Sequence, residues 1–233
     1  MNPILITGVG QRVGLHLART FIARGQPVIG TYRKRRDSID ELATLGVELH
    51  RCDFYDDAQV QALIDNVAKE HDRLRAIIHN ASDWLPDQAD YPPEEILRRM
   101  MAVHVAAPYR INLGLADLLK AGAPSDIVHV GDYVSGRGSK KHIAYAASKA
   151  AQDNLTLSFA ALLAPDVKVN SIAPALVLFN EHDDAAYRER TLRKSLMQRE
   201  GGLDEMQHQV DYLLGSQYVT GRIIHMDGGR HLV

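Results

Sequence analysis

The sequence has little cysteine, few aromatic residues and no long apolar run. Cys52 is the one cysteine among 233 residues, so it excludes an internal disulfide and offers no metal-ligand spacing. No stretch reaches the roughly 20 apolar residues that cross a bilayer, and the first residues lack the basic and apolar segments of a signal peptide. We therefore expect a cytoplasmic protein that binds neither a membrane nor a metal.

The sequence also lacks a large excess of either positive or negative charge. Lys and Arg number 27 against 29 Asp and Glu, and the net charge of −2 predicts no general affinity for nucleic acid. Hydrophobic residues make up 45% and charged residues 24%, which is typical of a globular protein. Because this length suits one α/β domain and no repeat or linker interrupts the chain, we expect a single domain over residues 1–233.

Short apolar runs alternate with longer amphipathic stretches along nearly the whole chain. This alternation predicts an α/β fold, a Rossmann-type doubly wound parallel sheet of about seven strands flanked by helices. The expected strands are Ile4–Ile6, Pro27–Tyr32, Val47–Arg51, Arg75–His79, Asp126–Val130, Val167–Ala173 and Ile223–Met226. The expected helices are Val13–Arg24, Ser38–Leu45, Asp56–His71, Glu94–Leu119, Ile143–Leu163 and Leu203–Leu214. Segment 178–202 is expected to be an irregular substrate lid or a mobile surface loop.

A glycine-rich turn, residues 7–14, follows the first expected strand and opens the first helix. Gly8 permits the tight turn, Gly14 favours close contact between strand and helix, and free N–H groups at the helix start attract a diphosphate. At this place in the chain the turn predicts nucleotide binding rather than a plain turn. The residues expected to contact the cofactor here are Gly8, Gln11, Arg12, Val13 and Gly14.

Four successive cations, Arg33, Lys34, Arg35 and Arg36, follow Tyr32 at the end of the second expected strand. An NAD enzyme places a carboxylate here for the ribose hydroxyls, whereas cations suit the 2′-phosphate of NADP. A solvated basic turn would account for about two of the four. The run therefore predicts NADPH as the cofactor, with Tyr32 and Arg33 as its first contacts.

Tyr145 and Lys149 form a Y-x-x-x-K pattern in an expected helix. Their four-residue spacing places both side chains on one helix face. The ammonium group favours phenolate and is expected to lower the tyrosine pKa towards neutrality. The pair therefore predicts catalysis, with Tyr145 as the proton donor and Lys149 as its partner and a holder of the nicotinamide ribose.

Taken together, these motifs resemble the short-chain dehydrogenase/reductase family, from Thr7 to the Asp-Gly-Gly that ends at Gly229. The resemblance implies that Asp53 contacts the adenine and that Asn80 and Ala81 lie beside the cofactor. Pro174, after the sixth expected strand, also belongs to the implied cofactor contacts. A plain turn or cap would explain any of these alone, and their places at the ends of successive strands make them informative.

At three positions the sequence resembles the pteridine reductase branch of that family. Asp132 stands 13 residues before Tyr145, where the family usually has a serine. A carboxylate there repels a carbonyl oxygen and suits a ring that presents N–H groups. Arg12 replaces a patterned glycine, and Trp84 is placed to stack on a pterin ring, with a core or interface tryptophan as the alternative. Ser135 is the alternative to Asp132 if a bulge shifts the register.

The resemblance implies NADPH-dependent reduction of a 7,8-dihydropteridine to its tetrahydro form. The chain looks most like the bacterial dihydromonapterin reductases, a branch with some activity on dihydrofolate. Arg12 and Asp132 would clamp the polar ring edge, Trp84 would stack on the ring, and Tyr145 would manage the proton. The alternatives are an NADPH-dependent carbonyl reductase for 3-oxoacyl or quinone substrates and a non-catalytic NADPH-binding regulator.

One departure and one assembly expectation complete the sequence-based picture. His104 stands where the family usually has the asparagine of a proton relay, so it either relays a proton or fills the same space. The long helices expected over 94–119 and 143–163 commonly pair in family members, which implies a homo-oligomer, a tetramer. The other histidines have no ligand spacing.

Overall fold

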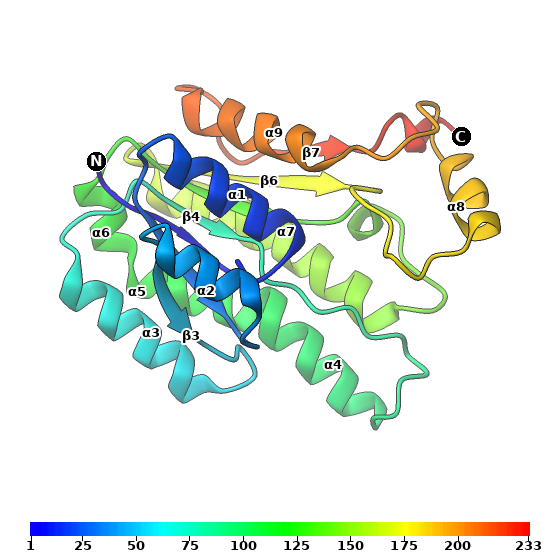
Figure 1. Ribbon diagram of the computed structural model, residues 1–233, viewed down its shortest axis with the longest axis horizontal. Coiled ribbons are helices and arrows are strands. Elements are labelled where there is room, and N and C mark those ends of the chain that lie inside the picture. Colours follow the sequence, from blue (N-terminus) through cyan, green and yellow to red (C-terminus); the bar gives the residue numbers. More distant parts are fainter.

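The computed structural model describes residues 1–233 and contains one sheet of seven parallel strands in the order β3-β2-β1-β4-β5-β6-β7 (Figure 1). The strands are β1 (Ile4–Ile6), β2 (Val28–Tyr32), β3 (Glu48–Arg51), β4 (Ala76–His79), β5 (Ser125–Val130), β6 (Val167–Pro174) and β7 (Ile223–Met226). The central strands are short runs of Ile, Val and Leu that are buried on both faces, as parallel sheets require. The predicted doubly wound fold is confirmed.

Two helical layers cover this sheet (Figure 1). The helices are α1 (Arg12–Ala23), α2 (Asp37–Thr44), α3 (Asp57–Glu70), α4 (Pro93–Met101), α5 (Ala107–Gly114), α6 (Ala116–Ala121), α7 (Ile143–Leu163), α8 (Ala185–Leu192) and α9 (Leu203–Gly215). The apolar faces of α1, α2 and α9 form one core with one side of the sheet. Those of α3, α5, α6 and α7 form the other core. Each fully buried Leu or Ile in these cores contributes about 2 kcal/mol to folding.

The chain order reverses at β1, and this reversal positions the functional site. β1 pairs with β2 on one side and with β4 on the other, so that Ile4 lies between Val28 and Ala76 in register. In doubly wound sheets a crevice forms beyond the carboxyl ends of the strands at such a reversal. The turns that follow β1, β2 and β4 therefore lie where this fold binds ligands.

The helix predicted over 94–119 is wrong as one continuous element. A π-helical turn, Ala102–Ala106, separates α4 from α5, and a break at Leu115 separates α5 from α6. Pro108 supplies the physical reason for the first interruption, because it lacks an N–H and its ring clashes with the carbonyl one turn earlier. The extra residue in the turn absorbs that clash while the helix axis continues.

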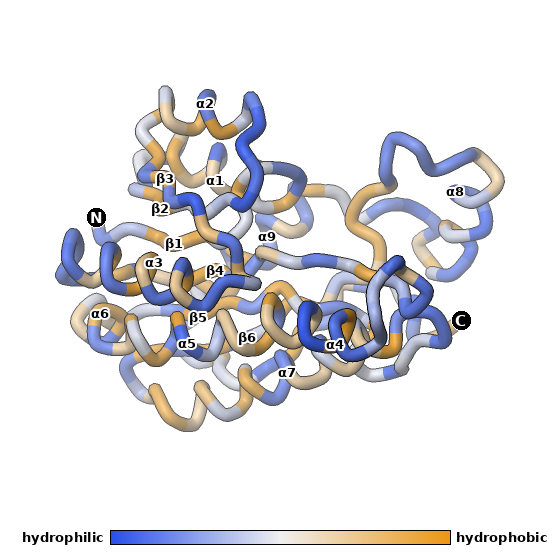
Figure 2. The backbone as a smooth tube through the Cα atoms, turned by 90° about the horizontal axis from the view of Figure 1, so that it is seen from below, coloured by the Kyte–Doolittle hydropathy of each residue, from blue (hydrophilic) through white to orange (hydrophobic).

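The irregular loop predicted over 178–202 is wrong in part, because it contains helix α8. The Asp184 side chain caps this helix by accepting a hydrogen bond from the Tyr187 N–H at 2.7 Å. The segment around α8 is largely hydrophilic, which is why its periodicity was weak, whereas the central strands are largely hydrophobic (Figure 2). None of the helices combines the length and the apolar character needed to span a membrane.

Candidate functional site

A cleft of about 430 Å³ lies at the carboxyl ends of the strands. Its walls come from the turns after β1, β2, β3, β4 and β5, from α7, and from the segment after β6. Of the residues predicted from the sequence, those that line it are Gly8, Gln11, Arg12, Val13, Tyr32, Arg33, Asp53, Asn80, Ala81, Asp132, Tyr145, Lys149 and Pro174. The fold therefore brings together nearly the whole predicted constellation, from segments that are far apart in the sequence.

The turn between β1 and α1 is closed against β4 by Asn80. Its Nδ2 donates to the carbonyl oxygens of Thr7 and Gly8, both at 3.0 Å. Gly14 does not line the cleft but makes this closure possible, because a Cβ there would lie 2.2 Å from the Gly8 oxygen and 2.4 Å from Asn80 Nδ2. Gly8 has a φ of +75°, which favours glycine. Both glycines therefore serve the shape of the turn.

Arg12 adopts a positive φ of 50°, the left-handed region in which a glycine is ordinarily found. Its guanidinium donates to Asn180 Oδ1 and to the Leu178 carbonyl oxygen, both at 2.8 Å. The side chain thus joins the start of α1 to the segment after β6, across the mouth of the cleft. Arg12 therefore lies at the part of the cleft where the sequence predicts contacts with the diphosphate and the substrate.

The basic run after β2 divides between the cleft and the surface. Arg33, Lys34 and Arg36 line the cleft, whereas Arg35 pairs with Asp40 outside it. Arg33 Nη1 donates to Asp83 Oδ2 at 3.0 Å, and neither Lys34 nor Arg36 has a carboxylate partner. Uncompensated cations beside a cleft favour a phosphate.

Tyr55 is a cleft residue that sequence reasoning missed. Its hydroxyl donates to Asp83 Oδ2 at 2.7 Å, so that Tyr55 and Arg33 hold the same carboxylate oxygen. Burial acts to raise the pKa of Asp83, but these hydrogen bonds lower it overall. No motif marks Tyr55 in the sequence; only its position two residues after Asp53 could have suggested it.

Tyr145 and Asp132 form the central polar pair of the site. The Tyr145 hydroxyl donates to Asp132 Oδ2 at 2.7 Å, while Asp132 Oδ1 accepts from the Val134 N–H at 2.8 Å. Asp132 lies two residues after the end of β5 and caps the short 3₁₀ turn Tyr133–Gly136, which fixes the orientation of the carboxylate. Ser135, the alternative to Asp132, does not line the cleft, and its side chain faces Asp153.

The predicted lowering of the Tyr145 pKa is wrong in this structure. Burial, followed by the charge and hydrogen bond of Asp132, raises the pKa of Tyr145 above its ordinary value, so the group is a phenol at neutral pH. Lys149 Nζ donates to the Val130 carbonyl oxygen at 2.8 Å and to Gln152 Oε1 at 3.2 Å rather than to the phenol. Burial lowers the pKa of Lys149 to about 8.

His104 belongs to a buried chain of hydrogen bonds behind Tyr145. Ser148 Oγ donates to the Tyr145 carbonyl oxygen at 2.7 Å and therefore accepts from His104 Nδ1 at 2.8 Å. Burial, helped by the Lys149 charge, lowers the pKa of His104 well below its usual value. The neutral imidazole then accepts at Nε2 from Ser82 Oγ, 2.8 Å away. Ser82 also lines the cleft, and it was not among the predicted site residues.

Trp84 is the predicted substrate residue that the structure does not bring into the cleft. Its indole stacks on His142 with ring centroids 4.1 Å apart, and the residue is 59% exposed. Its backbone N–H donates to Asp83 Oδ1 at 3.0 Å. Trp84 therefore lies on the outer side of the carboxylate that Arg33 and Tyr55 hold, beside the cleft rather than in it.

Several groups of the cleft could hold a dinucleotide. No side chain caps the N-terminus of α1, so its free N–H groups are available to a diphosphate. Gly8 and Gly10 of the same turn line the cleft without a side chain. Lys34 and Arg36 supply positive charge at the end of β2. Asn80, Tyr145 and Lys149 line the same cleft.

Comparison with known proteins agrees with this geometry. Residues 8–231 match a family profile described as enoyl-(acyl carrier protein) reductase. Dihydromonapterin reductases of Escherichia coli strain K12 and of Shigella dysenteriae are 54% identical over 232 residues, covering 99% of this chain and 97% of each relative.

A solved structure is similar as well. FolM alternative dihydrofolate reductase 1 from Brucella canis, complexed with NADP, superposes with a TM-score of 0.89 at 26% identity, covering 100% of this chain and 94% of the other. The fold, the full-length match and the Tyr145–Lys149 pair agree with one another. The chain belongs to the short-chain dehydrogenase/reductase family, on the branch that contains the dihydromonapterin reductases.

Proposed function

We propose that this protein reduces a 7,8-dihydropteridine, dihydromonapterin foremost, to the tetrahydro form with NADPH. The observation that carries the proposal is the contact between the Tyr145 hydroxyl and Asp132 Oδ2 at 2.7 Å. The activity of the relatives that are 54% identical supports the same reaction.

Asp132 favours a nitrogen-containing ring over a ketone. A carbonyl that accepts hydride develops negative charge on its oxygen, and a carboxylate at this position would oppose that charge. A reduced pterin presents amino and ring N–H groups, which can donate to both carboxylate oxygens of Asp132. The Val134 N–H and the 3₁₀ turn hold the carboxylate in place for this contact.

Tyr145 is suited to hold and release one proton. Its raised pKa keeps it protonated, and its proton lies on the hydrogen bond to Asp132. When ring N–H groups of the substrate donate to Asp132, they weaken its hydrogen bond with Tyr145. Tyr145 can then donate its proton to N5 of the ring. The reaction balances when C6 gains a hydride and N5 gains this proton.

The cofactor residues follow from the shape of the cleft. NADPH, when bound, supplies the hydride. Arg33, Lys34 and Arg36 would hold its 2′-phosphate, and the free N–H groups of α1 would hold its diphosphate. Lys149 lies deep in the cleft, where it would donate to the nicotinamide ribose. Family members bind a nicotinamide dinucleotide in this fold.

The test is NADPH oxidation by the purified protein with dihydromonapterin, dihydrobiopterin and dihydrofolate, and with a 3-oxoacyl thioester for comparison. We expect turnover of the pteridines and a loss of about 100-fold in the Asp132→Ser variant. The matched control is Asp72→Ser, which changes an exposed aspartate at the far end of β4. Reduction of the thioester alone would identify a carbonyl reductase, and tight NADPH binding without turnover would identify a regulator.

We propose in addition that the protein is a homo-oligomer that pairs through α5 and α7. Tyr109 and Leu113 of α5 are 47% and 44% exposed, and Leu157 and Leu162 of α7 are 46% and 61% exposed. Tyr109 contacts Phe159 of α7, which joins the two apolar faces. Light scattering after gel filtration should give a multiple of 25.9 kDa, and Leu157→Glu should reduce it.

A further inference from the structure

A second cavity, of about 360 Å³, opens beside the catalytic pair. It is lined by Asp132, Tyr133, Val134, Arg137, Gly138, Ala175, Lys194, Arg230 and Val233. Asp132 and Ala175 also line the main cleft, so the two cavities share a wall. A substrate held at Asp132 can therefore extend a substituent into the second cavity.

This second cavity has an excess of positive charge. Arg137, Lys194 and Arg230 line it, and Asp132 is its one acidic side chain. None of the three cations forms an ion pair, although ion pairs are common elsewhere on the molecule. The neighbouring Arg193, by contrast, is paired with Glu189. The cations around the cavity are thus available to an external anion.

Tyr133 contacts two of these cations. The guanidinium carbons of Arg137 and Arg230 each lie 5.1 Å from the centre of its ring. The ring is buried, and its hydroxyl donates to the Arg230 carbonyl oxygen at 3.4 Å. Both cations also line the cavity, so an anion bound there would offset the repulsion between them.

The third cation is placed by the segment that follows α8. The Met197 N–H donates to the Gly228 carbonyl oxygen at 3.1 Å, which ties this segment to the turn that contains Arg230. Lys194, three residues earlier, thereby reaches the same cavity as Arg230. Three separate segments converge on one cavity, and each contributes one cation.

We propose that this cavity binds the anionic end of those pteridine substrates that carry one, a carboxylate or phosphate group on the side chain. The proposal rests on the dihydropteridine reductase activity proposed above and specifies its substrate class. A neutral side chain gains less from the three cations than an anionic one, so the site adds affinity for charged substrates. Guanidinium groups recognise both carboxylates and phosphates through paired N–H donors.

Steady-state kinetics on three substrates would test this cavity. Dihydromonapterin has a neutral side chain, its phosphate monoester adds a phosphate, and dihydrofolate adds the carboxylates of a glutamate. We expect Arg137→Met, Lys194→Met and Arg230→Met each to lower kcat/KM about tenfold for at least one anionic substrate. We expect each to lower it less than about twofold for dihydromonapterin, because the pterin contacts remain.

The matched control is Lys140→Met, which removes one exposed charge near Arg137 without touching the cavity. A selective loss for dihydrofolate identifies a carboxylate tail, one for the phosphate ester identifies a phosphate tail, and a loss for both identifies a general anion site. Equal losses for charged and neutral substrates, or equal losses in Lys140→Met, would overturn the inference alone. A wild-type protein that reduces none of the three would overturn the proposed function, and this inference with it.

Discussion

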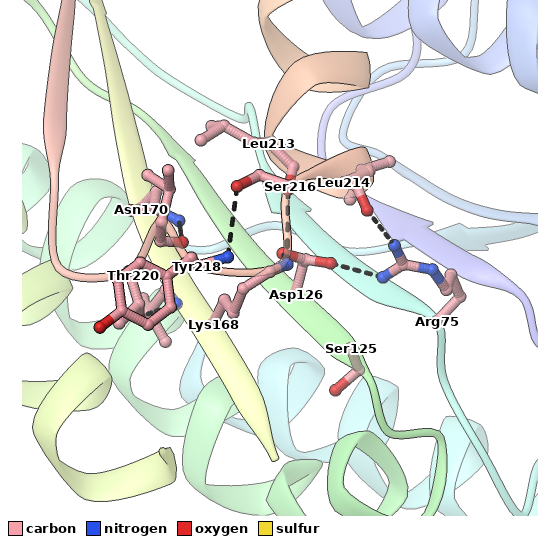
Figure 3. Close-up of polar contacts among 12 residues, drawn as sticks. Arg75, Ser125, Asp126, Lys168, Asn170, Leu213, Leu214, Ser216, Tyr218 and Thr220 are labelled. Carbon is pink, nitrogen blue, oxygen red and sulfur yellow. Dashed lines mark hydrogen bonds and ion pairs between the residues drawn. The ribbon is translucent and has the colours of Figure 1, made fainter. Parts of the chain in front are cut away.

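The two ends of the sheet use charged residues in opposite ways. At the amino ends of β4, β5 and β6, the buried carboxylate of Asp126 accepts from Arg75 Nη1 at 2.5 Å and from Lys168 Nζ (Figure 3). The same two cations donate to the Leu214 and Leu213 carbonyl oxygens near the end of α9, at 2.6 and 3.4 Å. Each charged group in this cluster has a partner of opposite charge, with the two cations sharing the carboxylate of Asp126.

At the carboxyl ends, compensation is incomplete. Lys149 is buried and bonds to neutral oxygens, and Asp132 bonds to the neutral Tyr145 hydroxyl. Lys34 and Arg36 line the cleft without carboxylate partners. Buried or crowded charge without an opposite partner is costly, and a ligand that brings the missing group recovers that cost.

This difference between the two ends of the sheet separates the charges that stabilise the fold from those that are available for function. A compensated cluster ties helix α9 to three strands and has no capacity left for a ligand. The uncompensated groups are collected where the fold opens a cleft. Substitutions should therefore separate the two ends: changes at Asp126 act on stability, and changes at the carboxyl ends act on activity.

The largest effect is expected for Tyr145→Phe, which removes the hydroxyl and nothing else. We expect kcat for dihydromonapterin to fall about 1,000-fold, because the one group placed to protonate the ring is lost. The melting temperature and the affinity for NADPH should remain close to those of the wild type. A variant that keeps more than a tenth of the wild-type kcat would show that another group supplies the proton.

The next effect is on stability and concerns Asp126→Ala. Removing a carboxylate that is 1% exposed leaves Arg75 and Lys168 without their partner, which should cost about 3 kcal/mol in the free energy of unfolding. Arg24→Gln, which breaks the more exposed pair with Asp211, should cost about 1 kcal/mol or less. Denaturant titration measures both, and equal losses would contradict the comparison between the two ends.

A smaller effect is expected on cofactor choice. Arg36→Met should raise the KM for NADPH about tenfold and leave the KM for NADH unchanged, because NADH lacks the 2′-phosphate. Arg35→Met removes the same charge one residue earlier, where the guanidinium is engaged with Asp40 outside the cleft. Initial rates with both cofactors give the comparison. Equal increases in the KM for NADPH in the two variants would indicate that Arg36 acts through its general electrostatic field and does not contact the phosphate.

The smallest effect is a pH dependence that comes from Lys149. Its pKa of about 8 means that its charge is lost as the pH rises through 8, so kcat/KM should decline there. An unfolded lysine keeps its proton to about pH 10.4, so this group's contribution to stability rises over the same interval while activity falls. Measuring kcat/KM and the free energy of unfolding in parallel from pH 7 to about 10 tests whether activity falls while stability rises. A flat rate profile would contradict the lowered pKa.

Much of the fold was predictable because its signals are local. Short apolar runs and helical periodicity each depend on residues within one or two turns, and they located all seven strands. The interruption of the helix that begins at Pro93 and the presence of helix α8 were not predicted, because neither produces a clear local signal. A π-turn leaves hydrophobic spacing nearly intact, and α8 has too few buried residues to show a period.

The candidate site was predictable where motifs occupy the ends of strands. Gly8 and Asn80 were identified because a parallel sheet collects its carboxyl ends at one edge, whereas Tyr145 and Lys149 were identified from their four-residue spacing on one helix face. Tyr55 and Ser82 were missed because they act through contacts with Asp83 and His104. The catalytic and binding roles assigned to these residues stay predictions that the variants above test.

The sequence by itself determined the layered α/β fold, the places of its strands and the glycine turn after the first strand, because spacing and residue type dictate these locally. Tertiary structure alone decided that Tyr145 is bonded to Asp132 and that Trp84 stacks on His142. It also decided that Arg12 reaches Asn180, 168 residues away. Such contacts depend on how distant segments pack, and burial then sets the pKa of each group that they enclose.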